Sequence, residues 1–359
     1  MNPAQPTLWL DASQRIMTID QTCLPFERVE IELSDPVVCA MAIRDMQVRG
    51  APLIGVVAAF GLALAMSRSA SDESLQSAYQ MLLATRPTAV NLRWALDRVR
   101  ARIQDQLPVR RALLAWHEAN AIREEDIQCN RAIGEHALHL LRPLIERAKA
   151  GSRPLQLLTH CNAGALGTVA WGTALAPMFL LRQQGVDLHV WVDETRPRNQ
   201  GASLTAWELG QAGIAHTVVA DNAGGLLMMQ ERVDAVLVGC DRVSANGDVC
   251  NKIGTYLKAL AAAAHRVPFY VACPRSSIDR QLASGDRIPI EERSEREVSH
   301  VRGVNPAGEV VEVRIIAEGV RCLNLAFDIT PAALVSALIT ERGACAADPA
   351  AIAALFAAA

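Results

Sequence analysis

The 359-residue sequence lacks the short motifs that mark several large enzyme classes. It has no G-x-G-x-x-G run after a strand and no G-x-x-x-x-G-K run followed by Ser or Thr, which disfavours a dinucleotide enzyme and a P-loop hydrolase. Its nine cysteines are scattered, with no C-x-x-C pair and no histidine-paired zinc spacing. We therefore expect no metal and no cofactor, and we expect reduced thiols in a cytoplasmic protein.

Charge and hydropathy argue against two further classes. The formal net charge of −3 lacks the basic excess of a general nucleic-acid binder, so an anionic ligand would need a local cluster of cations. The first residues lack a basic stretch followed by an apolar core, so we expect no signal peptide. The most apolar segment, Leu53 to Met66, is too short to cross a bilayer. We expect a buried helix there and no membrane contact.

The apolar spacing changes its period near the middle of the chain, which predicts two domains. Residues 1–150 have mainly helical spacing after short strands within 8–19 and 29–33. The helices are expected at 37–46, 51–66, 75–83, 89–103 and about 111–149, the last interrupted near Pro143. Residues 151–359 instead alternate short apolar strands with helices, which predicts an α/β domain with a parallel sheet.

Polar residues follow each expected strand of the second half. The strands are expected at 155–159, 188–192, 215–220, 235–239 and 269–272, with helices at 165–183, 203–211, 225–230 and 252–264. The polar sets begin at His160, Asp193, Asp221, Asp241 and Pro274. Any one set alone could equally be a helix cap. Five sets at one edge of a parallel sheet favour a ligand site, because open α/β sheets bind ligands there.

Two of these residues are candidate catalytic groups. Cys161 precedes an expected helix, whose dipole would lower the pKa of a thiol, although in isolation a buried structural cysteine is the more common reading. His160 beside it is more simply a core or supporting histidine. Asp241 follows an apolar strand, so burial would raise its pKa and keep it protonated as a general acid. Its alternative role is a cap of the following turn.

The candidate anion ligands lie at two expected helix starts and on one helix. Arg49 and the amides of Gly50 and Ala51 precede the apolar helix, where they could hold an anion. Arg93 lies on a helix among apolar neighbours. Asn251 and Lys252 are expected to open the helix at 252–264. Arg49 and Arg93 could each also be an ordinary solvated side chain.

Taken together, these segments resemble the S-methyl-5-thioribose-1-phosphate isomerases of methionine salvage, which are related to regulatory subunits of the eukaryotic translation-initiation nucleotide-exchange factor. The resemblance covers nearly the whole chain. Its segments are Asp20-Gln21-Thr22, VRGAPLIG from Val48, RPTAVNLRWALDR from Arg86, NRAIGEH from Asn130, LTHCNAGALGT from Leu158, DETRPRNQGASLTAWEL from Asp193, GCDRVSANGDVCNKIGTY from Gly239, IPIEERS from Ile288 and AFDITPAALVSALITERG from Ala326.

The resemblance implies a fold, an activity and a set of site residues. It implies a helical N-terminal domain beside a Rossmann-like domain, a homodimer, and an aldose-ketose isomerase of a sugar 1-phosphate. By position, Cys161 and Asp241 match the catalytic pair of the family. Its substrate-binding positions match Arg49, Gly50, Ala51, Arg93, Gln200, Asn251 and Lys252. Cys240, Ser244 and Leu325 depart from the usual residues, which are alanine, alanine and proline.

Several alternatives stay open at this point. Cys161 could move a proton between two carbons or stabilise a hydride shift. A sibling isomerase would act on 5-deoxyribose 1-phosphate or ribose 1,5-bisphosphate. A non-catalytic regulatory module is the third possibility, and the presence of both Cys161 and Asp241 argues against it.

Overall fold

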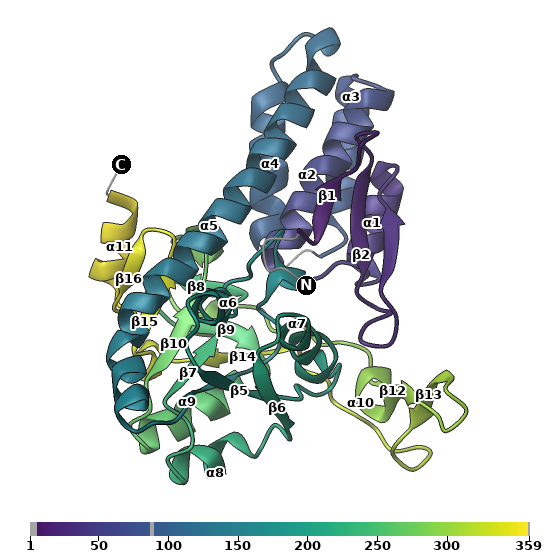
Figure 1. Ribbon diagram of the computed structural model, residues 1–359. Helices are drawn as coiled ribbons and strands as arrows, with labels where there is room; N and C mark the ends of the chain where they lie inside the picture. The colour runs from purple at the N-terminus through teal and green to yellow at the C-terminus, as the bar shows by residue number, and fades with distance from the viewer. Residues whose placement is uncertain (1–5, 87–89, 358–359) are drawn as a thin grey trace.

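The structure is a computed structural model that describes residues 6–86 and 90–357. A helical part and a part built on a parallel sheet lie at opposite ends of the molecule, joined by one long helix (Figure 1). The chain begins with an antiparallel sheet of β1 (Leu8–Leu10), β2 (Ile16–Asp20) and β3 (Val29–Glu32). The expected strand at 8–19 is thus two strands. Asp11 divides them, because its side chain accepts the main-chain N–H groups of Ser13 and Arg15 in a turn.

The expected helices of the first half are present. They are α1 (Pro36–Arg44), α2 (Ala51–Arg68), α3 (Asp72–Leu83) and α4 (Val90–Ile103); the expected start of the last, at residue 89, lies outside the described residues. By length and composition α2 could cross a membrane, but 78% of that stretch is buried inside the protein. As expected, the segment is a core helix: its apolar side chains pack against those of the neighbouring helices.

The helix α5 (Pro108–Ala150) is common to both parts of the molecule. Ala115 and Ala119 pack in the core of the helical part, whereas Ile133 and Ala137 pack in the core beneath the sheet. The expected interruption at Pro143 is wrong, since the helix continues through it. Pro143 and the residue four positions earlier are both exposed, so the carbonyl that loses its partner faces water. The domain boundary predicted after residue 150 stays a prediction.

The predicted parallel sheet is present and has a Rossmann-like strand order. Its strands are β4 (Leu155–Thr159), β5 (Leu188–Asp193), β6 (Ala215–Val219), β7 (Ala235–Val238), β10 (Phe269–Ala272), β15 (Ala337–Thr340) and β16 (Gly343–Cys345). They lie in the order β16-β15-β10-β7-β4-β5-β6, with only β16 antiparallel to its neighbour. From β4 the chain first runs outward to β5 and β6 and then returns to β7. The strand order therefore reverses between β4 and β7, which is where ligands bind in open α/β sheets.

The connecting helices are α6 (Ala176–Gln183), α7 (Ala206–Gln211), α8 (Gly224–Met229) and α9 (Thr255–Ala264). The expected helix at 165–183 is wrong in its first half, where residues 165–167 form a single 3₁₀ turn. The main chain there bonds to distant segments instead: Thr7 N–H donates to the carbonyl of Val169, and Val169 N–H donates to Asp126. Tertiary hydrogen bonds thus replace the ladder that a helix would make.

A second, smaller sheet beside the first was not predicted. It comprises β8 (Arg242–Ser244), β9 (Val249–Lys252), β11 (Ile278–Asp279) and β14 (Phe327–Thr330), in the order β11-β8-β9-β14. After it, α10 (Arg296–Ser299) leads into the hairpin of β12 (His300–Val304) and β13 (Val310–Arg314), which projects from the body of the molecule (Figure 1). The chain closes with α11 (Pro349–Ala357).

Candidate active site

One cavity lies where the carboxyl ends of β4 and β7 face the start of α2. It gathers residues from distant parts of the chain, including most of those predicted from the sequence. The predicted residues that line it are Cys161, Asp241, Arg49, Gly50, Ala51, Gln200, Asn251 and Lys252. The reversal of strand order between β4 and β7 therefore forms the site, as the position of the polar residues after these strands predicted.

Arg93 is the one predicted site residue that does not line the cavity. On α4, Leu92, Ala95 and Leu96 are buried, so the helical period turns Arg93 to the exposed face. The geometry places Arg86 at the cavity instead. The role of Arg93 as a substrate ligand stays a prediction.

Asp241 and Lys252 are brought together by a hairpin. Asp241 follows β7 and directly precedes β8, while Lys252 is the last residue of β9. The two strands pair with Arg242 opposite Cys250, and the N–H of Asp241 donates to the carbonyl of Cys250 at 2.9 Å. The predicted helix start at Asn251 and Lys252 is thus wrong. Both residues end a strand, and α9 begins only after Gly254, whose φ of +103° breaks the strand.

Cys161 lies in a strained turn, where hydrogen bonds to Thr195 and Gln200 hold it. Its φ is +66°, in the left-handed region that non-glycine residues rarely occupy. Its N–H donates to Thr195 Oγ1 at 2.8 Å, and its Sγ lies 3.3 Å from Gln200 Oε1, to which a thiol proton would donate. The expectation that a helix dipole acts on this thiol is wrong, because only the short 3₁₀ turn follows it. Lys252 is the cation that acts electrostatically on Cys161.

Gln200 is positioned by an unusual helical turn. It directly precedes a π-helical turn at Gly201–Thr205, which continues into α7. A Cβ at Gly201 would lie 1.7 Å from the carbonyl oxygen of Asp193, so only glycine allows this turn to pack against the end of β5. Such single π turns are frequent at functional sites. Here the turn carries the amide of Gln200 to the thiol of Cys161.

Arg49 joins the helical part to the sheet. Its guanidinium donates to the side-chain oxygen of Asn162, and also to the Asn162 carbonyl at 2.8 Å. Gly50 has a φ of +94°, and a Cβ there would lie 2.3 Å from the carbonyl oxygen of Gly167. This close approach brings the start of α2 into the cavity. The unpaired N–H groups of a helix start attract anions, as the sequence predicted for this segment.

Three further cationic side chains line the cavity: Lys252, Arg86 and Arg293. Lys252 is buried over the ring of Phe327, 4.5 Å from its centre. Burial, followed by the charge of Arg293, lowers the pKa of Lys252 to about 8. Sequence reasoning missed Arg86 and Arg293, although both lie in segments that carried the family resemblance. Nothing in their local spacing distinguished them from surface arginines.

A carboxylate holds these two arginines. Glu291 accepts from Arg293 at 3.0 Å and from Arg86 at 3.2 Å. Burial alone would raise the pKa of Glu291, but the hydrogen bond from Arg293 and the charges of both arginines outweigh it and lower that pKa. Among the described residues, the cavity lining has four Lys or Arg side chains and one carboxylate, Asp241. The surplus of positive charge fits a phosphate ester, and it meets the need for local cations in a chain of negative net charge.

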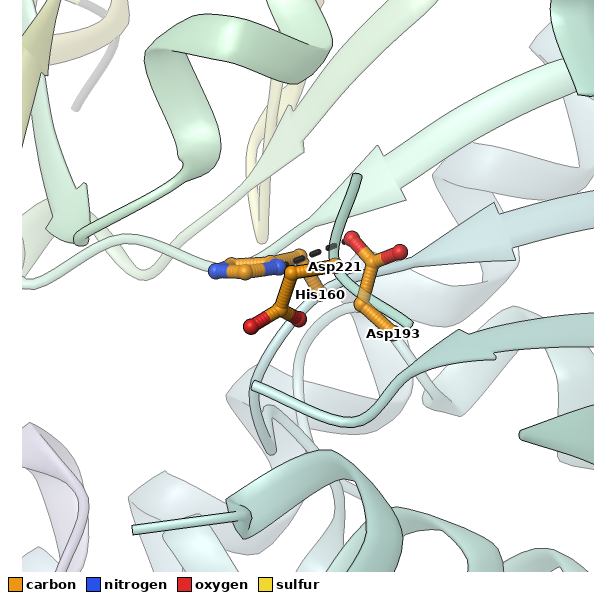
Figure 2. A group of neighbouring side chains, drawn as sticks. All are labelled: His160, Asp193 and Asp221. Carbon is orange, nitrogen blue, oxygen red and sulfur yellow. Dashed lines mark hydrogen bonds and ion pairs between the residues drawn. The ribbon is translucent and has the colours of Figure 1, made fainter. Parts of the chain in front are cut away.

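A buried cluster behind Cys161 has the residue types of a metal site. Ligand atoms of His160, Asp193 and Asp221 lie within 4.8 Å of one another. Figure 2 shows the ring of His160 directed at Asp193, while the carboxylate of Asp221 turns away from that pair. Asp221 accepts the N–H groups of Thr195 and Arg196, each at 2.7 Å.

A lysine already supplies the positive charge in this cluster. The Lys258 ammonium lies 3.1 Å from Asp193 Oδ2 and also donates to the carbonyl of Asp221. The buried carboxylate of Asp193 is therefore paired with a cation of the chain itself. The cluster thus has an ordinary role as a buried ion pair, and we assign no metal to it.

Comparisons with known proteins point to one family. Residues 47–347 match the model of the Initiation factor 2 subunit family. The chain is 53% identical to the methylthioribose-1-phosphate isomerase of Escherichia coli O45:K1, covering 98% of this chain and 94% of that protein. It is 54% identical to the protein of that name from Methylocella silvestris, covering 98% and 96%.

Solved structures agree with this result. The crystal structure of 5-methylthioribose 1-phosphate isomerase from Pyrococcus horikoshii OT3 superposes with a TM-score of 0.83 and 39% identity, covering 99% of this chain and 96% of that one. The subunit delta of translation initiation factor eIF-2B from A. fulgidus superposes with a TM-score of 0.78 and 36% identity, covering 96% of each chain.

We predict that anion binding in the cavity weakens at alkaline pH. Lys252 has a pKa of about 8, so it is cationic below this pH and loses its charge as the pH rises through it. Sulfate is a suitable probe, because its own charge is constant in this range. Its affinity, measured by calorimetry from neutral to alkaline pH, should fall about tenfold, the effect of one charge-assisted hydrogen bond. Lys252→Met should bind weakly at every pH, and a wild-type affinity that stays constant through pH 9 would contradict the assignment.

Proposed function

This chain belongs to the methylthioribose-1-phosphate isomerases of the Initiation factor 2 subunit family, and we propose that Cys161 and Asp241 carry out its chemistry. The enzyme is an aldose-ketose isomerase that converts S-methyl-5-thio-α-D-ribose 1-phosphate to S-methyl-5-thio-D-ribulose 1-phosphate in methionine salvage. The observation that supports the catalytic pair is their placement: both residues face one cation-lined cavity from the ends of adjacent strands.

The first chemical step is ring opening. The phosphate on C1 prevents the spontaneous opening that a free sugar undergoes, so the enzyme must assist cleavage of the bond between C1 and the ring oxygen. In our proposal, the carboxyl group of Asp241 gives a proton to the ring oxygen as this bond breaks. The carboxyl becomes a carboxylate, and the ring oxygen becomes the hydroxyl on C4. The cations around the cavity hold the phosphate during this step.

The second step moves hydrogen from C2 to C1. In the proton-transfer route, the Cys161 thiolate removes the proton from C2 and returns it to C1, while the proton of the C2 hydroxyl restores Asp241. In the hydride route, hydrogen passes directly from C2 to C1 and the thiol only stabilises the developing charge. Reaction in D₂O distinguishes the two, since only proton transfer allows deuterium to enter at C1.

An apolar hollow beside Asp241 suits the methylthio group. Its lining includes the side chains of Ile54, Ile288, Pro289 and Phe327, with Arg86 and Arg242 also on its wall. We propose that the 5-substituent of the sugar lies there, against the apolar side chains.

We predict that Asp241→Asn keeps the fold and the binding of product but loses most turnover. The amide has nearly the same shape but cannot transfer the proton. Loss of a positioned acid costs on the order of 10²- to 10⁴-fold in kcat. Steady-state kinetics on the purified enzyme measures this, with the exposed Asp286→Asn in the same domain as a matched control. An Asp241→Asn enzyme within a few-fold of wild type would remove Asp241 from the mechanism.

We predict that Arg86 and Arg93 differ sharply when each is replaced by methionine. Arg86→Met removes a cation that lines the cavity, so the dissociation constant of the product should rise about tenfold or more. Arg93→Met changes an exposed position on the same stretch of chain and should leave that constant within about twofold of wild type. Calorimetry with the product measures both. The reverse result would make Arg93 the phosphate ligand and reject that role for Arg86.

We also propose that the enzyme is a homodimer, with α8 and α9 in the interface. The two helices lie together at one end of the molecule, opposite the helical part (Figure 1). They expose large apolar side chains: Leu226 by 51%, Met229 by 59%, Leu257 by 65% and Leu260 by 40%. A contiguous apolar surface of this kind on a globular protein marks an association site.

Leu257→Glu should therefore shift the protein from dimer to monomer, because it places charge within the apolar surface. Light scattering coupled to gel filtration measures the mass. Leu113→Glu is the matched control, since Leu113 is also exposed, by 74%, but lies on α5 in the helical part. A dimer that survives Leu257→Glu and dissociates in the control would place the interface elsewhere.

We place the enzyme in the cytoplasm. All nine cysteines lie among the described residues and all are free thiols. A protein with nine free thiols and no disulfide among them is typical of a reducing compartment.

A further inference from the structure

We propose that His160 is a positioning residue that fixes the Lys252 ammonium relative to the Cys161 thiol, by bridging Asp193 and the carbonyl of Ile253. This inference rests on the roles proposed above for Cys161 and Lys252, and it adds His160, which lines the cavity but has no part in the proposed chemical steps. It arises from the buried cluster drawn in Figure 2, which the chemistry of the reaction leaves unexplained.

Both ring nitrogens of His160 are bound to acceptors. Nδ1 lies 2.8 Å from Asp193 Oδ2, and Nε2 lies 2.8 Å from the carbonyl oxygen of Ile253. Asp193 pairs with Lys258 through its carboxylate, which is a hydrogen-bond acceptor. The main-chain carbonyl of Ile253 can only accept. The ring thus contacts both acceptors, and which of the two it donates to depends on its tautomer. His160 is 1% exposed and Asp193 is fully buried, so water does not replace the bond between them.

These two bonds connect the segments that carry the reacting groups. His160 directly precedes Cys161 at the end of β4, and Ile253 directly follows Lys252 at the end of β9. A shift of the Ile253 carbonyl therefore moves the main chain of Lys252. The main chain at Gly254, just after Ile253, also packs closely on the ring. A Cβ added at Gly254 would lie only 2.9 Å from His160 Cε1. The ring thus acts as a spacer between the two segments.

The other end of the bridge is rigid. Asp193 ends β5 and is bound by Lys258 from α9. Thr195 accepts the N–H of Cys161 and donates to the Asp193 carbonyl at 2.9 Å, so the same strand end also holds the Cys161 turn. Movement of the ring would therefore change the position of Lys252 while Cys161 stays bound to Thr195. The distance between ammonium and thiol depends on the ring.

Two amide substitutions separate the two bonds of the ring. In His160→Asn the amide nitrogen takes the place of Nδ1, so the bond to Asp193 can form and the bond to Ile253 is lost. In His160→Gln the amide nitrogen reaches the place of Nε2, so the bond to Ile253 can form and the bond to Asp193 is lost. The inference gives the bond to Ile253 the larger effect. His189→Asn is the matched control, because His189 lies on β5 and does not line the cavity.

The readout is the pH at which sulfate binding weakens, with no substrate present. In the wild type this midpoint should follow Lys252, whose pKa burial lowers to about 8. His160→Asn releases the turn and gives the ammonium more water, so the midpoint should move upward by about one pH unit. Alkylation of Cys161 by iodoacetamide at neutral pH should slow, because the cation is no longer held beside the thiol. The turnover number should fall with it.

Each outcome decides the question. His160→Gln should lie closer to wild type than His160→Asn in both the sulfate midpoint and the alkylation rate. If both variants lose thermal stability but keep the wild-type midpoint and alkylation rate, His160 only supports the fold and the inference is overturned. If the wild type itself shows no midpoint, the assignment of Lys252 fails instead. Because neither assay uses the sugar, a failure of the proposed reaction would leave these results unchanged.

Discussion

Four cationic side chains crowd one small cavity, and their mutual repulsion is the constraint that the surrounding structure must meet. The chain meets it with hydrogen-bond acceptors on the wall of the cavity and just behind it. Glu291 holds Arg86 and Arg293, and Asn162 holds Arg49. Asn162 is held in turn by the buried Glu208, which accepts from its amide at 2.8 Å. The cations are thus fixed before a phosphate arrives, and binding does not have to order them.

Lys252 and Arg49 differ from Arg86 and Arg293, which pair with Glu291, because no ion pair with a carboxylate is found for either among the described residues. The ammonium of Lys252 lies over the ring of Phe327 and acts electrostatically on both Cys161 and Asp241. Burial therefore keeps its pKa near 8, where small changes in hydration alter its charge. An arginine in this place would stay charged at any accessible pH. The charge of a buried lysine depends on how much water reaches its ammonium, and therefore on where the ammonium lies. In our inference, the contacts of His160 with Asp193 and Ile253 fix that position.

The sequence predicted those parts of the site that follow directly from parallel strands. Apolar runs located β4 and β7, and the ends of neighbouring parallel strands bring Cys161 and Asp241 to one edge without further information. It could not predict the β8–β9 hairpin, because Arg242–Lys252 contains polar residues at buried positions that are satisfied only by tertiary partners. The same reason explains the error at 165–183, whose main-chain groups bond to the distant segments around Thr7 and Asp126. The helical period of α4 does explain why Arg93, which the family resemblance assigned to the substrate, lies on the exposed face of that helix and not in the cavity.

The shared fold does not by itself make this protein an enzyme. The chain superposes closely on the subunit delta of translation initiation factor eIF-2B from A. fulgidus as well as on an isomerase. The fold supplies the sheet edge where the strand order reverses between β4 and β7, and the glycine contact that brings the start of α2 to it. Such a site could bind an anionic ligand whether or not a reaction follows. Isomerisation needs more: a proton donor for the ring oxygen and a base for C2, held on opposite strands of that edge. In our proposal Asp241 is the proton donor and Cys161 the base of the proton-transfer route, and hydrogen bonds to Cys250, Thr195 and Gln200 hold them in place. The catalytic character of the chain therefore depends on a few side chains at the strand ends and on the hydrogen bonds that orient them.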